Sequence, residues 1–540
     1  MLINDENGLG RIKVSTIPLP NTIKVVSATY TYSGKVLIQY KTEKDLTIKD
    51  FFNIAIVDDD GNNFKNIFSG FIKKHKKSNG IRLLPFEDNK RVLLGDYILE
   101  CYPDIDNCQN VKLLRLTYPW FIRYDPYIML LWSEVIISPD NEHVVWTTLR
   151  FNSGSANFLG TLKRKKDKYV IINTHIISDI VSFKKDKKNK DYIIPQIIRG
   201  GEVKQFVRGG KAITLVGSMG GGISDSTLED LETGEVMQIT NTPGYNETTI
   251  FSPDEKLGIV MSTRGSKKTD PAIFCFLPRP YYRYYVTSLI VFPIYMYAVA
   301  GVRYFREGNI GPVLIEIEKS VNQESYQGVL LNDPEEKWVY VSPMSWHPSS
   351  KKAMFLEMMR GSFDRETGLP QLRVRKVELL DYKPSKIVQP TRTPDNISYS
   401  TKGFRAIIKY LFPPKMSGSF KIAGKYSGYI EYIRRQEKGQ KAFLKGEAEL
   451  KYINFSDDGK RFYNGIEKVN YSYMGETMYE ADVKMTGEEE GEMKLRATFS
   501  KIYGDTPSRL LFEKAEDGKP KSYGYVKYKG ITLNIEDLLP

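Results

Sequence analysis

The sequence predicts an all-β protein in which a β-propeller is followed by a separate antiparallel β-domain. Two observations lead to this fold. Most of the 540-residue chain consists of short runs rich in β-branched and aromatic residues, broken by Gly, Asp, Asn and Pro, and one two-strand unit recurs along it. With 41% hydrophobic and 26% charged residues, the chain can build a core and resembles neither a disordered protein nor a multi-pass membrane protein.

The recurring unit is an apolar strand, a Ser/His-Pro-Asp/Ser turn, a second apolar strand and a final Arg. It is clearest at residues 134–150 (EVIISPDNEHVVWTTLR), 247–264 (ETTIFSPDEKLGIVMSTR) and 342–360 (SPMSWHPSSKKAMFLEMMR). Proline fixes φ at the first corner of such a turn, and Asp or Ser can bond to the backbone two residues later. Weaker copies place further turns near positions 34, 89 and 209. Six turns predict six blades, with seven as the alternative.

Residues 226–264 contain an outer hairpin, a connection, a strand, the Ser-Pro-Asp turn and a second strand, in that order. This is a four-stranded propeller blade in circular permutation. The unit resembles the TolB-type β-propeller repeat, and the resemblance covers roughly residues 20–390. Asn141 and Glu255 stand where that repeat has Gly, and His347-Pro348-Ser349 replaces Ser-Pro-Asp. We therefore expect a propeller over residues 1–390.

The residue pattern of the chain changes after position 390. Residues 391–417 are linker-like and contain Pro394, Pro413 and Pro414. Residues 418–540 again show strand-like alternation, as in SGYIEYIRR and KAFLKGEAELKYINFSDDG. We predict a C-terminal antiparallel β-domain here, and a further blade of the propeller is the alternative.

A helical apolar insert is expected at about 277–308. Its centre, residues 285–302 (YVTSLIVFPIYMYAVAGV), has 18 residues without a charge, which is the lower limit for a membrane span. Pro293 and three tyrosines weaken that interpretation, and a buried or groove-covering helix is the stronger one. A peripheral membrane contact through this segment stays open. The N-terminus lacks a secretory pattern, so a cytoplasmic location is expected, with membrane association as an option.

The composition narrows the choice of partner and cofactor. The formal net charge is +13, but the lysines lie in short runs between strand-like segments, as expected for solvated hairpin tips. We expect no nucleic-acid partner, because zinc spacings, recognition helices and arginine-rich stripes are missing from the sequence. The four histidines are far apart in sequence, so neither a metal nor another cofactor is expected. The sequence also contains no G-x-S-x-G elbow.

Three glutamates occupy nearly the same place in their repeats, four or five residues before the turn: Glu134, Glu202 and Glu247. In a propeller this place is the start of the innermost strand, at the mouth of the central channel. Carboxylates that converge there could serve as general acid and base, because crowding drives their proton affinities apart. Alternatively, they bond to backbone amides of neighbouring blades.

Aromatic and basic residues of the same repeats are candidates for substrate binding. The aromatic candidates for stacking on a sugar ring near the same rim are Trp132, Tyr245 and Trp346, and His347 follows directly. Arg150, Arg264 and Arg360 end the second strand of their repeats and could bind an anionic group such as a uronate. The other interpretation of these arginines is structural, and Asp270 could pair with Arg264.

Several stretches also resemble the saponin hydrolases, among them GGEVKQFVRGG, TPGYNETTIFSPDE and YMYAVAGVR. This resemblance implies removal of a sugar, such as glucuronate, from a triterpenoid glycoside, and an apolar insert would suit the aglycone. The first hypothesis is thus a metal-independent glycoside hydrolase that uses the three glutamates. The alternative is a non-catalytic propeller scaffold that binds a protein or membrane partner, since fold alone does not decide function.

Overall fold

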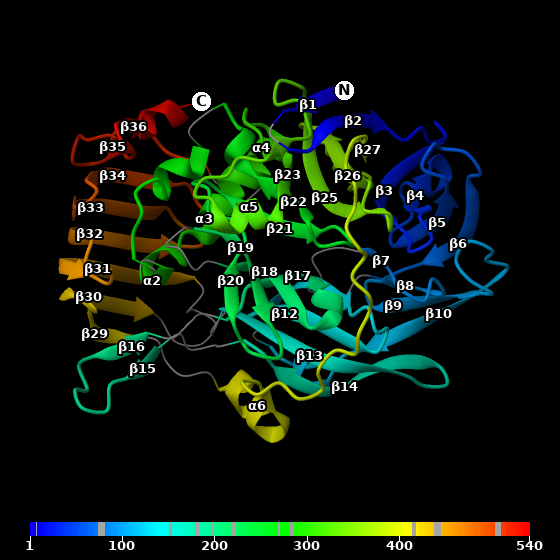
Figure 1. Ribbon diagram of the computed structural model, residues 1–540, viewed down its shortest axis with the longest axis horizontal. Helices are drawn as coiled ribbons and strands as arrows, with labels where there is room; N and C mark the ends of the chain where they lie inside the picture. Colours follow the sequence, from blue (N-terminus) through cyan, green and yellow to red (C-terminus); the bar gives the residue numbers. More distant parts are fainter. Residues whose placement is uncertain are drawn as a thin grey trace.

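The computed structural model describes residues 1–6, 8–73, 82–126, 128–150, 154–178, 183–195, 199–217, 223–267, 270–280, 282, 284–412, 417–436, 444–502 and 509–539. Four-stranded antiparallel units from the first 380 residues surround a common centre, and an eight-stranded sheet from the C-terminal part lies beside them (Figure 1).

The four-stranded units are built from strands that follow one another in the sequence, apart from the last unit. The first three units are β3 (Ile23–Tyr30), β4 (Val36–Thr42), β5 (Phe51–Val57) and β6 (Lys65–Phe71); β7 (Leu83–Pro85), β8 (Arg91–Leu94), β9 (Tyr97–Tyr102) and β10 (Asn110–Thr117); and β11 (Ile128–Ile137), β12 (His143–Arg150), β13 (Gly154–Arg164) and β14 (Lys168–Ile176). The next two are β17 (Glu202–Val207), β18 (Ala212–Gly217), β19 (Asp225–Asp230) and β20 (Val236–Gln238); and β21 (Asn246–Phe251), β22 (Leu257–Ser262), β23 (Pro312–Glu316) and β24 (Val329–Leu330).

The last unit joins the two ends of the ring. It consists of β25 (Trp338–Trp346), β26 (Lys352–Met359), β27 (Leu372–Leu379), the N-terminal strand β2 (Gly10–Thr16) and, at its edge, β1 (Leu2–Asp5). Strand β2 pairs antiparallel with β27, so that Ile12 lies opposite Leu379. Outside the units lie the hairpin β15 (Phe183–Lys185) and β16 (Ile193–Pro195), and the short strand β28 (Thr401–Lys402).

The first strands of the units line the centre. β25 lies beside β3, β3 beside β7, β11 beside β17, β17 beside β21, and β21 beside β25. This ring of inner strands, with meanders running outward from it, confirms the predicted all-β propeller. Two of the units share one sheet, because β10 pairs with β14 in parallel. Since the sheet pattern does not separate those two, the number of blades stays a prediction.

The predicted turns between first and second strands have a common geometry. In the third unit the Ser138 amide donates to the His143 carbonyl (2.9 Å) and the Asn141 amide donates to the Ser138 carbonyl (2.9 Å), and the fifth unit repeats both bonds around Ser252. Each turn also contains at least one residue with positive φ, a conformation that favours Gly and Asn. These residues include Gly34, Asn89, Asn141, Gly209, Glu255 and Ser350.

The C-terminal sheet is a meander in strict sequence order. Its strands are β29 (Gly418–Ala423), β30 (Ser427–Gln436), β31 (Lys445–Ser456), β32 (Arg461–Ser472), β33 (Thr477–Gly487), β34 (Gly491–Phe499), β35 (Tyr523–Tyr528) and β36 (Ile531–Asn534). Buried residues alternate with more exposed ones along β33, as expected for a sheet with one covered face. Eight strands in one meander agree with the predicted antiparallel domain.

The helical segments are short, and several belong to the apolar insert. They include α1 (Trp120–Arg123), α2 (Tyr284–Thr287), α3 (Val291–Tyr295), a π-helix (Met296–Gly301), α4 (Val302–Tyr304), α5 (Ile317–Asn322) and α6 (Gly403–Leu411). The insert separates β22 from β23, and every residue from 285 to 302 is buried or half-buried. Its side chains Val286, Ile290 and Ile294 share one core with Ile430 and Leu450 of the C-terminal sheet.

The apolar insert therefore packs between the ring and the C-terminal sheet, and burial of this apolar surface stabilises their association. In the part of the chain that the structure describes, we find no helix both long enough and apolar enough to cross a membrane.

A buried ion pair reinforces this contact. Arg279 of the insert lies 3.2 Å from the Glu467 carboxylate of β32, and both side chains are fully buried. The hydroxyls of Tyr452 (3.0 Å) and Tyr479 (2.7 Å) donate to the same carboxylate. Arg279 also donates to the Phe274 carbonyl (2.8 Å). A buried carboxylate with this many donors meets the requirement that buried charges be paired and hydrogen-bonded.

The segment predicted as a linker is held against the ring. The Thr391 amide donates to the Gly209 carbonyl (2.8 Å), and the Thr393 hydroxyl donates to the Gly210 carbonyl (2.9 Å). Strand β28 then pairs with β14, and α6 follows at the lower edge of the molecule in Figure 1. Residues 391–412 thus run along the third and fourth units.

Candidate functional site

Glu202 and Glu247 lie at equivalent places on neighbouring inner strands, as predicted. Glu202 is the first residue of β17, and Glu247 is the second residue of β21. A β-bulge follows at once in each strand, between Val203 and Gln205 and between Glu247 and Thr249. Bulges bend a strand and redirect its side chains, and here the extra residue in β17 is Lys204.

Lys204 brings the two glutamates together. Its ammonium lies 2.7 Å from Glu202 Oε2 and 3.4 Å from Glu247 Oε1. The Lys204 side chain is 2% exposed, whereas the two carboxylates keep 11% and 12% of their surface. The arrangement is a buried cation that shares two carboxylates, each still reachable from solvent. We call Glu202, Lys204 and Glu247 the central triad.

Tyrosines and an arginine surround the central triad. The Tyr245 hydroxyl donates to Glu247 Oε2 (2.8 Å), and burial, together with Glu247, raises the pKa of Tyr245 well above its usual range. Tyr245 therefore stays protonated as a hydrogen-bond donor at neutral pH. Tyr295 of the insert lies near Tyr245 (ring centroids 6.4 Å apart), and burial raises its pKa to about 12. Arg82 lies 3.9 Å from Glu202 Oε1.

Two of the predicted site residues cannot be placed relative to the central triad. Glu134 and Trp132 belong to β11, but their side chains lie outside the described residues. Their strand is the inner strand of the third unit and lies beside β17.

Trp346 and His347 are not near the triad but at the opposite ends of the inner strands. Trp346 is the last residue of β25, is largely buried, and donates through Nε1 to the Ile250 carbonyl (2.8 Å). His347 begins the following turn, bonds to Ser349 Oγ (2.8 Å), and packs edge-on against Tyr30. We expected both residues near the rim; they lie elsewhere because the turn follows Trp346 directly, whereas Glu202 and Glu247 precede their turns by several residues.

The repeated arginines act on backbone and neighbouring side chains. Arg150 is fully buried against Asp125 (2.7 Å) and donates to the Tyr410 carbonyl. Arg264 donates to the Tyr326 carbonyl (2.8 Å) and to Asn246 Oδ1 (3.0 Å), and burial lowers its pKa to about 10. These contacts match the structural interpretation.

The third repeated arginine behaves in the same way. Arg360 donates to the Gly308 carbonyl (3.1 Å) and to the Arg306 carbonyl. The expected pairing of Asp270 with Arg264 is corrected: Asp270 pairs with Arg306 (2.9 Å), because the start of the insert carries it toward that residue.

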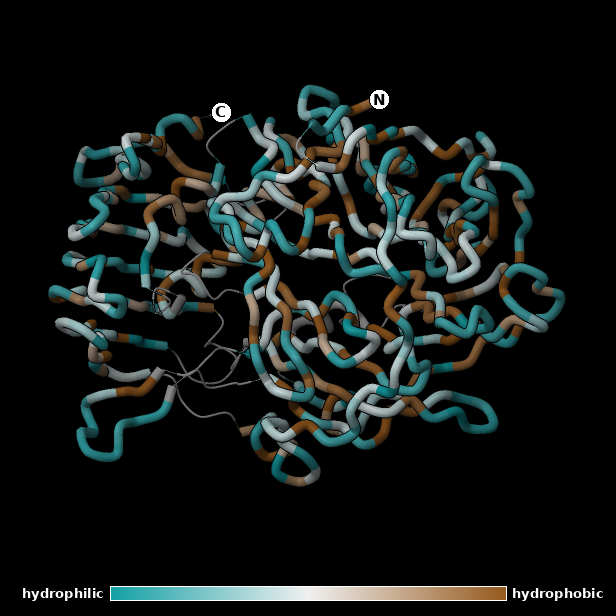
Figure 2. Tube along the Cα trace, viewed as in Figure 1, coloured by the Kyte–Doolittle hydropathy of each residue, from teal (hydrophilic) through white to brown (hydrophobic). Residues whose placement is uncertain are grey.

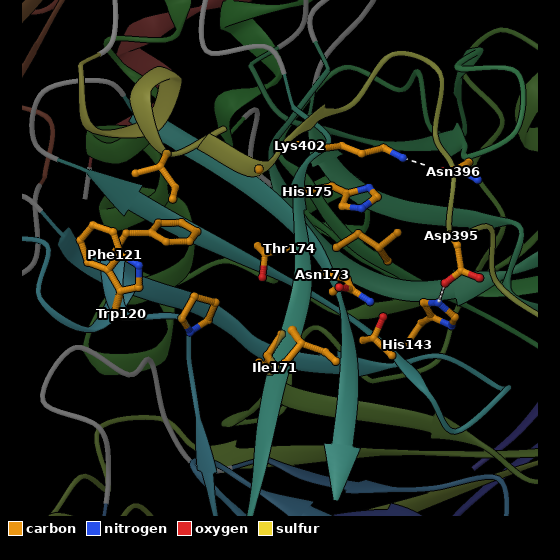
Figure 3. A pocket seen from close by; sticks show the side chains of 17 residues that line it. Trp120, Phe121, His143, Ile171, Asn173, Thr174, His175, Asp395, Asn396 and Lys402 are labelled. Carbon is orange, nitrogen blue, oxygen red and sulfur yellow. Dashed lines mark hydrogen bonds and ion pairs between the residues drawn. The ribbon is translucent and has the colours of Figure 1, made fainter. Parts of the chain in front are cut away.

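A second polar cluster lines a cavity of about 850 Å³ on the outside of the third unit (Figure 3). His143 is hydrogen-bonded through Nδ1 to Asp140 (2.6 Å) and through Nε2 to Asp395 (2.9 Å). Burial opposes its charge, but these two carboxylates raise the pKa of His143 overall. Asp395 belongs to the segment after the ring, so this contact fastens that segment to the third unit.

Sequence reasoning did not identify Lys204, Arg82 or Tyr295. Lys204 carried a usable signal, since it stands two positions after Glu202 in a strand and so shares its face. Tyr295 approaches through the packing of the insert, which no local pattern predicts. Within the described ranges no group of three or more His, Cys, Asp or Glu side chains is placed to hold a metal ion.

Comparisons with known proteins give structural likeness only. No family model matches the chain, and no curated protein matches it. TolB from Acinetobacter baumannii is 10% identical, with 68% of this chain and 64% of that one covered and a TM-score of 0.27. A luciferin-regenerating enzyme is 10% identical (71% and 100% covered, TM-score 0.32).

A puromycin-hydrolyzing peptidase from Mycobacterium tuberculosis is 8% identical, with 77% of this chain and 59% of that one covered and a TM-score of 0.32. At these values the likeness carries no functional argument, and the fold assignment depends on the strand pairing described above.

Proposed function

We propose that the protein is a hydrolase whose reaction takes place at the central triad, and that its substrates are glycosides. The observation that carries the proposal is the convergence of Glu202 and Glu247 on one buried ammonium while both stay partly exposed. Both oxygens lie within 3.4 Å of the same nitrogen, so they are about 6 Å apart or less. Glycosidases that retain configuration hold their two carboxyl groups ~5 Å apart, and those that invert it hold them further apart.

The surroundings support a different role for each carboxylate. Glu202 makes the shorter contact with Lys204, and in this proposal it is the nucleophile that attacks the anomeric carbon. Glu247 then donates a proton to the leaving oxygen as the glycosidic bond breaks, and Tyr245 orients it. In the second step Glu247 takes a proton from water, which attacks the anomeric carbon and releases Glu202.

The chemistry around the triad supports the proposed substrate class. Tyr295, which is half-buried, offers aromatic surface for a sugar ring or an apolar aglycone. Arg82, beside Glu202, offers a cation for an anionic sugar such as glucuronate. An apolar glucuronide of the saponin type, as the sequence resemblance implies, combines both features.

The test is hydrolysis of aryl glucosides, aryl glucuronides and a triterpenoid glucuronide by the wild-type protein, Glu202→Gln and Glu247→Gln. We expect each substitution to lower kcat/KM by at least ~10³-fold with the fold intact. Glu235→Gln, in the exposed turn of the same unit, is the matched control and should keep full activity. Azide should restore turnover to Glu202→Ala. Full activity in both glutamine variants would remove the triad from the mechanism.

A non-catalytic scaffold is the second candidate. It is favoured by the same ion pairs, because Lys204 neutralises both carboxylates in a buried position, as a purely structural cluster requires. In that case the wild-type protein turns over none of the glycosides, whereas Glu202→Gln and Glu247→Gln lower the thermal unfolding midpoint and Glu235→Gln does not.

A further inference from the structure

The exposed apolar side chains of the described surface include a row along α6. Phe404, Ile408 and Phe412 are spaced by four residues, so they lie on one side of the helix, and they are 75%, 42% and 72% exposed. On the other side Ala406 and Tyr410 are buried. The helix thus has two apolar sides, and the ring covers one of them.

The short helix α1 extends this row. Phe121 packs against Tyr410 of α6 (ring centroids 5.9 Å apart), so the two helices are neighbours. Trp120 and Tyr124, at the two ends of α1, are 59% and 70% exposed. Trp120 lines the cavity of Figure 3 together with Gly403 and Ile407 of α6. We define the apolar row as Trp120, Tyr124, Phe404, Ile408 and Phe412.

Two lysine-rich hairpins flank the apolar row. The tip of β13–β14 carries Lys163, Lys165, Lys166 and Lys168, and the tip of β15–β16 carries Lys184, Lys185, Lys187, Lys188 and Lys190, all of them exposed. In Figure 1 these hairpins and α6 all reach the lower edge of the molecule, with α6 between them, and Figure 2 shows both tips as hydrophilic. Arg405 adds an exposed positive charge to α6 itself.

We propose that this edge is a docking surface for an anionic lipid bilayer. Aromatic side chains inserted at the headgroup level, with lysines around them, are the arrangement that binds proteins to such surfaces. The chain also carries a net charge of +13, which attracts it to anionic lipid. A second copy of the chain is the poorer occupant, because face-to-face docking would bring both sets of lysines together.

The proposed docking surface does not include the apolar insert, because the side chains of the insert lie in the core between the ring and the C-terminal sheet. It also lies outside the central triad, so the proposal is independent of the hydrolase reaction.

The experiment is co-sedimentation of the full chain with vesicles of phosphatidylcholine, with and without roughly one third phosphatidylserine. We expect binding to the anionic vesicles, little binding to the neutral ones, and loss of binding in high salt, because the lysines lie within a screening length of the lipid charges. Phe404→Ser combined with Phe412→Ser should lower the bound fraction at least tenfold. Phe363→Ser, an exposed phenylalanine of the last unit, is the matched control and should bind like wild type.

A charge variant tests the second component separately. Lys165→Glu combined with Lys187→Glu should weaken binding to anionic vesicles and reduce its salt dependence, with the other seven lysines of the two tips still present. Thermal unfolding shows whether each variant is folded, and all four replaced side chains are exposed. Absence of wild-type binding to anionic vesicles would overturn the proposal. A wild-type dimer in sedimentation equilibrium that the double phenylalanine variant abolishes would also overturn it, by assigning the row to a second copy.

Discussion

Replacing Glu467 by Gln tests the buried ion pair that joins the insert to the C-terminal sheet. The substitution keeps the shape of the side chain but leaves Arg279 charged, fully buried and without its carboxylate 3.2 Å away. Removal of one partner of such a pair typically costs about 3–5 kcal/mol, because the remaining charge stays desolvated. At about 1.4 kcal/mol for each tenfold change, this corresponds to a roughly 100- to 4000-fold larger open population.

Hydrogen exchange followed by mass spectrometry measures this effect locally. The five tryptophans all lie between positions 120 and 346, so tryptophan fluorescence reports on the ring and not on the C-terminal sheet. In Glu467→Gln, the amides of peptides that cover β32 and β33 should therefore exchange roughly 100- to 4000-fold faster. This holds where exchange occurs through opening of the sheet. Asp482→Asn, which breaks an exposed pair with Lys494 on the same sheet, should change protection little.

A double substitution separates a loss of charge pairing from a loss of packing. Arg279→Met combined with Glu467→Gln removes both charges, so it should be considerably less damaging than the sum of the two single substitutions. If the double variant is as unstable as that sum, or if Glu467→Gln changes protection less than tenfold, the ion pair does not hold the insert to the sheet.

The remaining predictions concern the ring. Lys204→Met leaves two carboxylates, at most about 6 Å apart, without the cation they share, a repulsion of at least ~3 kcal/mol at an effective dielectric constant of 20. Calorimetry should show a lower midpoint than for the half-buried control Lys211→Met, and equal midpoints would contradict this. Burial lowers the pKa of His143, but its two carboxylate partners raise it overall above 6.5. The ion pairs of protonated His143 therefore stabilise the fold fully below about pH 6, and this stabilisation is lost as the pH rises through the pKa of His143 in the folded protein. The cost of His143→Gln in urea unfolding should therefore shrink between about pH 6 and pH 9, and a constant cost would refute it. Trp346→Phe leaves the half-buried Ile250 carbonyl without its donor and should cost ~0.5–1.5 kcal/mol in denaturant unfolding, whereas an unchanged midpoint would show that this bond adds nothing.

Local chemistry explains why the propeller could be predicted from sequence. The Ser-Pro-Asp turns are determined by Pro and by short polar side chains within a few residues, and the structure repeats their hydrogen bonds and their positive φ angles. Asn141 tolerates that backbone conformation, and at Glu255 the carboxylate accepts a bond from the Arg208 amide (2.5 Å), so the turn forms without Gly.

The candidate site was predictable only where it follows from the repeat. Glu202 and Glu247 converge because equivalent positions of a repeat meet at the same end of the ring. Tyr295 and Arg279 could not be assigned, since each reaches its partners through the docking of an insert whose direction no local pattern determines. Trp346 was misplaced because it is the last residue of β25, equivalent to Val207 of β17 and Phe251 of β21, and so lies at the end of the inner strands opposite the glutamates.

The pairing of β2 with β27 has a consequence for synthesis on the ribosome. Strand β2 is synthesised roughly 360 residues before its partner. At the usual rates of translation this is a delay of about 20–70 seconds. During that time its future partner edge does not exist, and its apolar residues Ile12 and Val14, which are buried in the finished protein, have no permanent cover. A molecular chaperone that shields extended apolar segments would be suited to cover residues 10–16 during this interval.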